Sequence, residues 1–98
     1  MLNVAILGCG RWGRNHLRVL SQLKQDGIVG KITVVDISKS ARESATLADI
    51  TSSSIDELDA ELVIIATPSH LHSNQAIELV KRGHHVLVEK PLGSSEYD

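Results

Sequence analysis

The chain has 98 residues, a formal net charge of −2, 42% hydrophobic residues and a single cysteine. No apolar run approaches the roughly 18 residues that a transmembrane helix needs, and the N-terminus lacks the basic segment of a signal peptide. One cysteine excludes an internal disulfide and a cysteine zinc site, and the charge balance gives no basic footprint for nucleic acid. The composition therefore predicts one folded, cytoplasmic domain that binds neither membrane nor nucleic acid.

The first two predicted elements are a strand and a helix. The apolar run at 3–7 ends at a glycine and predicts a strand that is buried on both faces, as in a parallel sheet. Residues 11–25 then change to a helical pattern, and Gly27 and Gly30 mark the exit from it. Three leucines form the apolar stripe of this predicted helix: Leu17, Leu20 and Leu23.

Shorter elements follow along the chain. Residues 31–36 predict a β-branched strand that ends on an acid. Ser38 or Ser40 can cap a short polar helix that runs to about residue 47. A brief edge strand is then expected at 50–52, and a helical turn near 56–58.

The second half of the chain repeats the alternation of strand and helix. Residues 62–66 give the clearest buried strand, and Ser69 is a suitable N-cap for a helix that runs to about residue 82. Gly83 suits the position after that helix, and 85–88 predict a further strand. The whole pattern predicts an α/β fold: a Rossmann-like, doubly wound parallel sheet of about five strands, incomplete because the last residues look like the start of another element.

Residues 8–13, Gly-Cys-Gly-Arg-Trp-Gly, match the pattern G-x-G-x-x-G between a predicted strand and a predicted helix. Here Gly8 would permit a tight turn, Gly10 would let a pyrophosphate approach the backbone, and Gly13 would let the helix pack close to the strands. The N–H groups at the helix N-terminus would face the phosphates. A glycine-rich turn without a ligand is the alternative, but the complete strand–turn–helix–strand–acid unit favours dinucleotide binding.

Asp36 stands at the end of the second predicted strand, where a carboxylate can accept hydrogen bonds from the adenosine ribose hydroxyls. Its charge would repel a 2′-phosphate, so NAD is the expected cofactor and NADP is disfavoured. Two competing nucleotide-binding classes fit less well. A methyltransferase would usually have an acid immediately before the glycine turn, where this chain has Leu7, and a phosphate-binding loop needs G-x-x-x-x-G-K-[ST], which is absent.

Two further loops are expected at the same site. In a doubly wound sheet the ligand lies beyond the carboxyl ends of the strands, where the strand order reverses. The strand at 62–66 should neighbour the first strand across that point, which would bring Thr67 and Pro68 to the cofactor. The strand at 85–88 would bring the sequence Glu-Lys-Pro at 89–91 to the same edge.

These segments together resemble the Gfo/Idh/MocA oxidoreductase family over essentially the whole chain. The resemblance rests on residues 8–13, Asp36, the segment Ala-Thr-Pro-Ser-His-Leu-His at 66–72 and Glu-Lys-Pro at 89–91, in the family's order. The last two segments together are far more specific than the glycines. Residues 10–16, Gly-Arg-Trp-Gly-Arg-Asn-His, further resemble members that oxidise nucleotide-linked N-acetylamino sugars or their uronic acids.

The resemblance implies a catalytic role for Lys90, beside the nicotinamide and the reacting carbon, where it would assist proton transfer from the substrate hydroxyl. Glu89 would position Lys90 or the cofactor, and Pro91 would follow a cis peptide bond that fixes the direction of the lysine. Without the resemblance, Lys90 would be interpreted as a solvated charge at a strand end. The expected cofactor-binding residues are Gly8, Gly10, Arg11, Trp12, Gly13, Asp36, Ala66, Thr67, Pro68, His72, Glu89, Lys90 and Pro91.

Several of these side chains have a purely structural alternative. Arg11 and Trp12 would flank the pyrophosphate and the nicotinamide ribose, although Trp12 can equally be a packing residue. His72 would brace its loop or contact the cofactor. Cys9 is a better small packing residue than a nucleophile, because no base partner is identifiable. His70 and His72 are two residues apart and diverge on a helix, so no metal site is expected.

The sequence therefore predicts the dinucleotide-binding domain, residues 1–98, of a NAD-dependent dehydrogenase. The family's second, larger α/β domain, which supplies substrate and oligomer contacts, has no counterpart in this sequence. The chain alone is expected to be inactive, while a homo-oligomeric full-length enzyme would transfer a hydride between a sugar or nucleotide-sugar secondary alcohol and the nicotinamide. The alternative is a non-catalytic dinucleotide-binding or redox-sensing module, against which Glu89 and Lys90 argue mildly.

Overall fold

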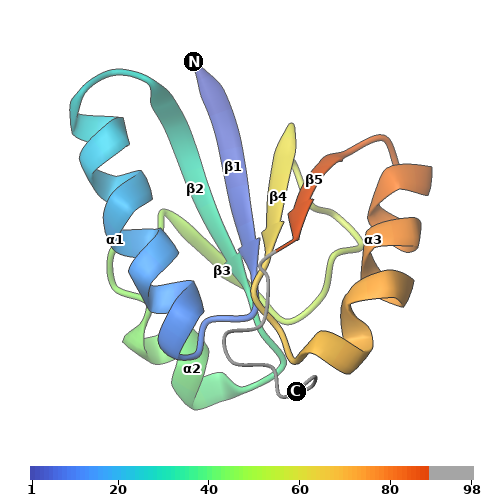
Figure 1. The fold of residues 1–98 in the computed structure, drawn as a ribbon. Helices are drawn as coiled ribbons and strands as arrows, with labels where there is room; N and C mark the ends of the chain where they lie inside the picture. The colour runs from blue at the N-terminus through green and yellow to red at the C-terminus, as the bar shows by residue number, and fades with distance from the viewer. Residues whose placement is uncertain (89–98) are drawn as a thin grey trace.

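Five parallel strands form the central layer of the computed structural model, which describes residues 1–88 (Figure 1). The strand order is β3-β2-β1-β4-β5, so the chain winds outward from β1 in both directions and the predicted doubly wound sheet is confirmed. The strands are β1 (Leu2–Leu7), β2 (Val29–Val35), β3 (Ile50–Ser52), β4 (Leu62–Ile65) and β5 (His85–Val88). The helices are α1 (Arg11–Gln25), α2 (Lys39–Ser44), the short 3-10 helix η1 (Ser69–Leu71) and α3 (His72–Lys81).

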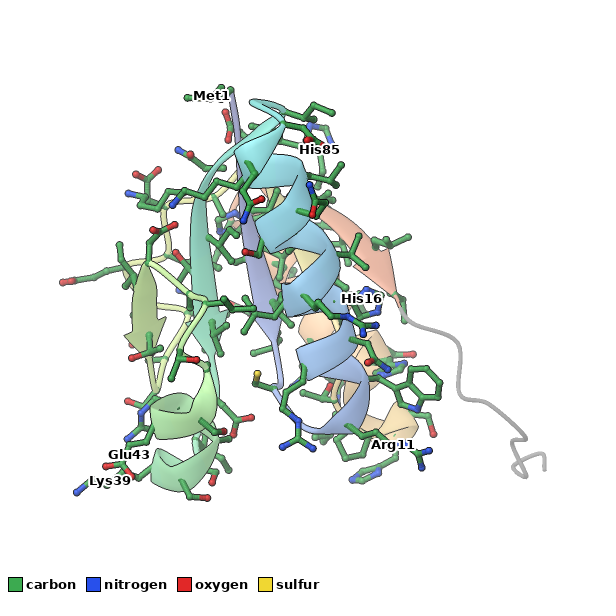
Figure 2. All side chains as sticks on the ribbon, turned by 90° about the vertical axis from the view of Figure 1, so that its left-hand side faces the viewer. Met1, Arg11, His16, Lys39, Glu43 and His85 are labelled. Atoms are coloured by element: carbon green, nitrogen blue, oxygen red, sulfur yellow. The ribbon has the colours of Figure 1, made fainter. Side chains whose placement is uncertain are left out.

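The register aligns the carboxyl ends of the strands at one edge. Leu7 of β1 lies opposite Val35 of β2 and Ile65 of β4. Val35 in turn lies opposite Ser52, and Ile65 opposite Val88. The residues that follow β1, β2, β3 and β4 therefore emerge side by side, at the end of the sheet where Arg11 begins α1 and opposite the end where Met1 lies (Figure 2).

The three central strands, β1, β2 and β4, bury both of their faces, as the apolar runs predict. Alternate residues of β1 face opposite ways: Val4 and Ile6 pack with Leu17 and Leu20 of α1, the stripe predicted for that helix. Their neighbours in β1, Ala5 and Leu7, belong to a second cluster around Leu79 of α3. Figure 1 shows α1 and α2 on one side of the sheet and α3 on the other.

Two local predictions are wrong. Gly30 lies inside β2 and not in the exit from α1, because the side chain of Asn3 crosses at an irregularity in the β1–β2 register. The Asn3 Oδ1 accepts a hydrogen bond of 2.8 Å from the N–H of Lys31, and it would lie 2.8 Å from a Cβ at Gly30. Ser69 does not cap a long helix, since residues 69–71 form a 3-10 turn and α3 begins at His72.

Other helix ends follow the sequence more closely. Ser38 caps α2 by accepting a hydrogen bond of 3.2 Å from the N–H of Ala41, although α2 ends at Ser44, earlier than predicted. Gly83 follows α3 with φ +94°, as a glycine after a helix C-terminus should. On the surface of α2, the side chains of Lys39 and Glu43 lie 3.9 Å apart (Figure 2).

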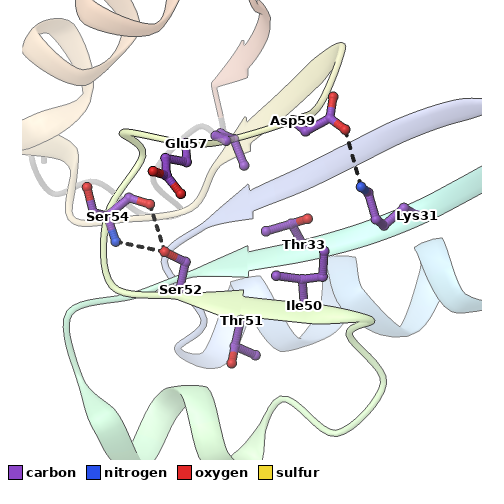
Figure 3. Close-up of a pocket in the computed structure, with 9 residues that line it drawn as sticks. Lys31, Thr33, Ile50, Thr51, Ser52, Ser54, Glu57 and Asp59 are labelled. Atoms are coloured by element: carbon purple, nitrogen blue, oxygen red, sulfur yellow. Dashed lines mark hydrogen bonds and ion pairs between the residues drawn. The ribbon is translucent and has the colours of Figure 1, made fainter.

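The connection between β3 and β4, residues 53–61, contains no helix. It has a single turn, in which the N–H of Leu58 donates to the carbonyl of Ile55 at 3.2 Å, where a helical turn is predicted. This leaves a cavity of about 320 Å³ over β2 and β3 (Figure 3). Lys31 and Asp59 form an ion pair of 3.2 Å at one side of this cavity, while Ser52 and Ser54 bond to each other at the other.

Asp49 joins three elements just before β3 begins. One carboxylate oxygen accepts a hydrogen bond from Lys24 of α1, and the other accepts one of 2.8 Å from the N–H of Ile32 in β2. The bond from Lys24 is the largest cause that holds the pKa of Asp49 below its ordinary value, followed by the bond from Ile32. A lowered pKa in the folded state means that this carboxylate stabilises the fold at neutral pH.

We expect Asp49→Asn to lower the free energy of unfolding at pH 7 by about 1 kcal/mol, a modest value because solvent screens a partly exposed pair. The stabilisation is complete above the ordinary carboxyl pKa and is lost as pH falls through the lowered pKa of the folded state. Urea denaturation from pH 7 to pH 3 should therefore show the two stability curves converging in acid. Asp59→Asn is the control, because its side chain is 80% exposed. Parallel curves for Asp49→Asn would contradict the prediction.

Candidate dinucleotide-binding site

The glycine turn between β1 and α1 is shaped by two close approaches. Gly8 has φ +93°, and a Cβ added there would lie 2.7 Å from Cγ2 of Thr67 in the loop after β4. A Cβ at the buried Gly13 would lie 2.1 Å from the carbonyl oxygen of Gly8. A side chain at Gly8 would therefore push the β4 loop away from the turn, and a side chain at Gly13 would push α1 away from it.

Gly10 differs from the other two glycines, because a Cβ added there would have no described atom within 4 Å. It precedes the first residue of α1, and no side chain caps the N–H groups of that first turn. These N–H groups and the partial positive charge of the helix terminus are the usual partners of a phosphate. Gly10 thus opens a route by which an anion can reach the N-terminus of α1.

Asp36 is fixed by the backbone around it. Its Oδ2 accepts a hydrogen bond of 2.7 Å from the N–H of Cys9, and its Oδ1 accepts one of 2.9 Å from the N–H of Ser38. The guanidinium of Arg42 donates to the main-chain carbonyl of Asp36 at 2.7 Å. Each carboxylate oxygen has two lone pairs, so both can still accept from the hydroxyls of a ribose.

Cys9 is buried beneath this network, with 2% of its surface exposed. Burial raises the pKa of the Cys9 thiol, the carboxylate of Asp36 raises it further, and Arg14 lowers it. A buried thiol with a raised pKa is a poor nucleophile. The environment of Cys9 thus supports its interpretation as a packing residue.

The loop after β4 is held in place by hydrogen bonds to β1 and to α3. The N–H of Ala66 donates to the carbonyl of Leu7 at 2.8 Å, which continues the ladder between β4 and β1. The Nε2 of His72 lies 2.6 Å from the carbonyl oxygen of Thr67, so this nitrogen carries the proton and donates it. The hydroxyl of Thr67 donates to Oε1 of Gln75 in α3. Thr67 is therefore restrained through its main chain and its side chain.

One cavity of about 480 Å³ brings these parts together. Of the predicted site residues, it is lined by Gly8, Gly10, Asp36, Ala66, Thr67 and Pro68. Gly13 and His72 support the cavity from outside its wall. Arg11 and Trp12 directly follow Gly10 in the chain but do not line the cavity, and the Arg11 guanidinium lies over the Trp12 ring, 5.9 Å from its centre. Trp12 is 39% exposed, which argues against a role in core packing.

Three of the predicted site residues, Glu89, Lys90 and Pro91, lie outside the described residues. The remaining lining residues were missed by sequence reasoning: Leu7, Val35, Ile37, Ser53, Ser54, Ile55, Leu71 and Gln75. Ile37 and Ser53 had a usable signal, since each directly follows the end of a predicted strand or its capping acid. Gln75 had none, because one polar residue on an amphipathic helix is ordinarily solvated.

Three observations test whether the described residues fit a dinucleotide: an open approach at Gly10, an uncapped helix N-terminus and a carboxylate beside the same cavity. All three suit a pyrophosphate joined to a ribose. The fold and the site thus define a Rossmann-type dinucleotide-binding domain.

The chain belongs to the Gfo/Idh/MocA family of oxidoreductases, whose NAD-binding Rossmann fold it matches over residues 2–97. The resemblance seen in the sequence motifs is thereby confirmed, and so is NAD as the class of cofactor.

Individual relatives agree with this assignment. Glucose-6-phosphate 3-dehydrogenase of Bacillus subtilis is 35% identical over 99 residues, which cover 97% of this chain and 27% of that protein. Inositol 2-dehydrogenase 2 of Saccharopolyspora erythraea is 27% identical over 96% of this chain and 29% of that protein. The crystal structure of the WlbA dehydrogenase from Bordetella pertussis, in complex with NADH and UDP-GlcNAcA, matches with a TM-score of 0.79 and 29% identity, covering 93% of this chain and 29% of that one. The chain spans less than a third of the length of these relatives.

Residues 1–88 contain neither a cluster of metal ligands nor a helix that could span a membrane. No group of three or more histidine, cysteine, aspartate or glutamate side chains could hold a metal ion within that range. None of the helices in that range is both long and apolar enough to cross a membrane.

Proposed function

We propose that this chain is the cofactor-binding part of a dehydrogenase that oxidises a secondary alcohol of a sugar or nucleotide sugar. The proposal rests on one observation: the glycine turn, the Asp36 carboxylate and the Thr67 loop meet in the same cavity. In this proposal the N-terminus of α1 binds the pyrophosphate, Asp36 holds the adenosine ribose and disfavours a 2′-phosphate, and the Thr67 loop limits the position of the nicotinamide half.

NAD would supply the hydride acceptor for this reaction. The substrate would lose a hydride from its carbinol carbon and a proton from its hydroxyl, giving a ketone, a reduced nicotinamide and one free proton. We propose that Lys90 accepts the proton that leaves the substrate hydroxyl, as the family resemblance implies. Substrate contacts and the oligomer interface would come from a further domain, because the relatives are more than three times as long as the chain.

Titration of NAD into the folded chain, followed by calorimetry, tests this proposal directly. We expect saturable but weak binding and a preference for NAD over NADP, with little turnover by the chain itself. Gly10→Val is the matched variant, because its side chain would fill the open approach to α1. An absence of saturable binding at millimolar NAD, by a chain whose circular dichroism shows it folded, would overturn the proposal.

A further inference from the structure

The nucleotide cavity extends beyond the glycine turn to side chains from three other segments. Ile37 follows β2, Ile55 lies in the loop after β3, and Pro68 and Leu71 lie in the loop after β4. All four are apolar and line the same cavity as Asp36. If Asp36 holds the adenosine ribose, the adenine attached to that ribose lies among these four side chains. Apolar walls suit the faces of a flat heterocycle but leave the ring nitrogens at its edge without partners.

Gln75 supplies a polar group at this part of the cavity. It belongs to α3, is half-buried and lines the cavity wall. Its Oε1 accepts the hydrogen bond from the Thr67 hydroxyl, and this bond fixes the orientation of the amide. The Nε2 carries two hydrogens, and no residue in the range 1–88 accepts a hydrogen bond from it.

Four other polar side chains line the cavity: Asp36, Ser53, Ser54 and Thr67. Thr67 has given its one hydroxyl hydrogen to Gln75, so it cannot donate to a ligand. The Oγ of Ser54 accepts a hydrogen bond of 3.0 Å from the N–H of Asp56 in the same loop. This leaves its hydroxyl hydrogen, like that of Ser53, free to rotate and without a fixed direction. Both side-chain oxygens of Asp36 act as acceptors, since they receive the N–H groups of Cys9 and Ser38. Among the described residues, Gln75 is therefore the side-chain donor of this cavity whose direction is fixed by another hydrogen bond, and four apolar side chains line the same cavity.

We propose that Gln75 determines base specificity in this cavity: its Nε2 donates a hydrogen bond to a ring nitrogen of the adenine, while Thr67 holds its Oε1. The inference rests on the proposed function, since it requires that the cavity binds the adenosine half of NAD. It assigns to α3 a role that the glycine turn and Asp36 cannot fill, because both of those contact the phosphates and the ribose.

Two substitutions separate the donor from the hydrogen bond to Thr67. Gln75→Glu keeps an acceptor for the Thr67 hydroxyl but loses the donor, whereas Gln75→Leu loses both. Asn74→Glu is the matched control, because it adds the same charge at the neighbouring exposed position, which does not line the cavity. Affinities would be measured by calorimetry with NAD, with AMP, and with the 1-deaza, 3-deaza and 7-deaza analogues of AMP.

We expect both Gln75 variants to bind AMP and NAD about tenfold more weakly than the wild type, and Asn74→Glu to bind them almost normally. One of the three deaza analogues lacks the nitrogen that accepts the hydrogen bond from Gln75. The wild type and Gln75→Leu should bind that analogue with equal affinity. Unchanged affinity of both Gln75 variants for AMP, or an equal loss with all three analogues, would overturn the role of Gln75 while NAD binding by the wild type still stood. A wild-type chain that binds neither AMP nor NAD would overturn the proposed function and this inference with it.

Discussion

Gly13→Ala is expected to lower the free energy of unfolding by about 3 kcal/mol, the upper part of the usual range for overpacking. The added Cβ, whose position the helix backbone fixes, would lie 2.1 Å from the carbonyl oxygen of Gly8, a main-chain atom that cannot rotate aside. Alanine favours a helix over glycine by about 1 kcal/mol, which is too little to offset this contact. Urea denaturation followed by the fluorescence of Trp12, the only tryptophan in the chain, measures the loss.

Gly10→Ala is the control for this prediction, because its Cβ would meet no described atom within 4 Å. We expect its stability to stay within about 0.5 kcal/mol of the wild type, as for other surface substitutions. Its affinity for NAD should nevertheless fall about tenfold, since the methyl group occupies the approach to the helix N-terminus. Equal stability of Gly13→Ala and Gly10→Ala would show that α1 does not pack on the glycine turn as closely as the structure has it.

Asp36→Ala is expected to have two separable effects. Affinity for NAD should fall between about tenfold and a hundredfold and the preference for NAD over NADP should narrow, because the ribose loses its acceptor and a 2′-phosphate loses its repelling charge. Stability should fall by about 1–2 kcal/mol, because the N–H of the buried Cys9 loses its partner. Calorimetry with both cofactors measures the first effect and urea denaturation the second.

Asp36→Asn provides the comparison, since its amide oxygen can keep one of the two backbone N–H groups while the charge is removed. It should recover part of the stability but none of the discrimination against NADP. An unchanged ratio of NAD to NADP affinity in Asp36→Ala would remove Asp36 from its proposed role, whatever happened to stability.

The fold was predictable wherever one stretch of sequence carried its own pattern. The run at 62–66 is apolar without interruption, which specifies a strand covered on both faces, and the structure places β4 there. The leucine spacing in α1 likewise specifies which side of the helix is buried. Such elements depend on their own side chains and little on the partner they meet.

Predictions failed where a distant residue decided the outcome. Gly30 resembles a breaker, yet Asn3, 27 positions earlier, crosses over it and bonds the next N–H, which keeps it within β2. Ser69 has the chemistry of a cap, but the hydrogen bond of 3.0 Å from the N–H of Leu71 to the carbonyl of Pro68 closes a tighter turn first. Local propensity cannot anticipate either contact.

The candidate site divides in the same way. The meeting of the glycine turn and Asp36 at one cavity was predictable, because their spacing along the chain matches a strand–turn–helix–strand unit that ends on an acid. Gln75 was not, because its significance comes from Thr67, which lies eight residues earlier and directs its amide. A side chain that acts through its neighbour's hydrogen bond leaves no pattern in a single sequence.

The loop after β3 contains no helix, so the walls of the cavity of about 480 Å³ differ in stiffness. β3 has three residues and pairs with one strand, whereas β1 pairs on both sides and anchors the glycine turn. Short, half-covered strands open locally at much lower free energy than central ones, so amide protons of β3 should exchange with solvent well before those of β1. On the proposed function, Ile55, which lies in the loop after β3 and lines the cavity, would then shift as the nucleotide enters while the glycine turn keeps its shape. Ligand binding by this domain would thus combine a rigid glycine turn with a more mobile loop after β3.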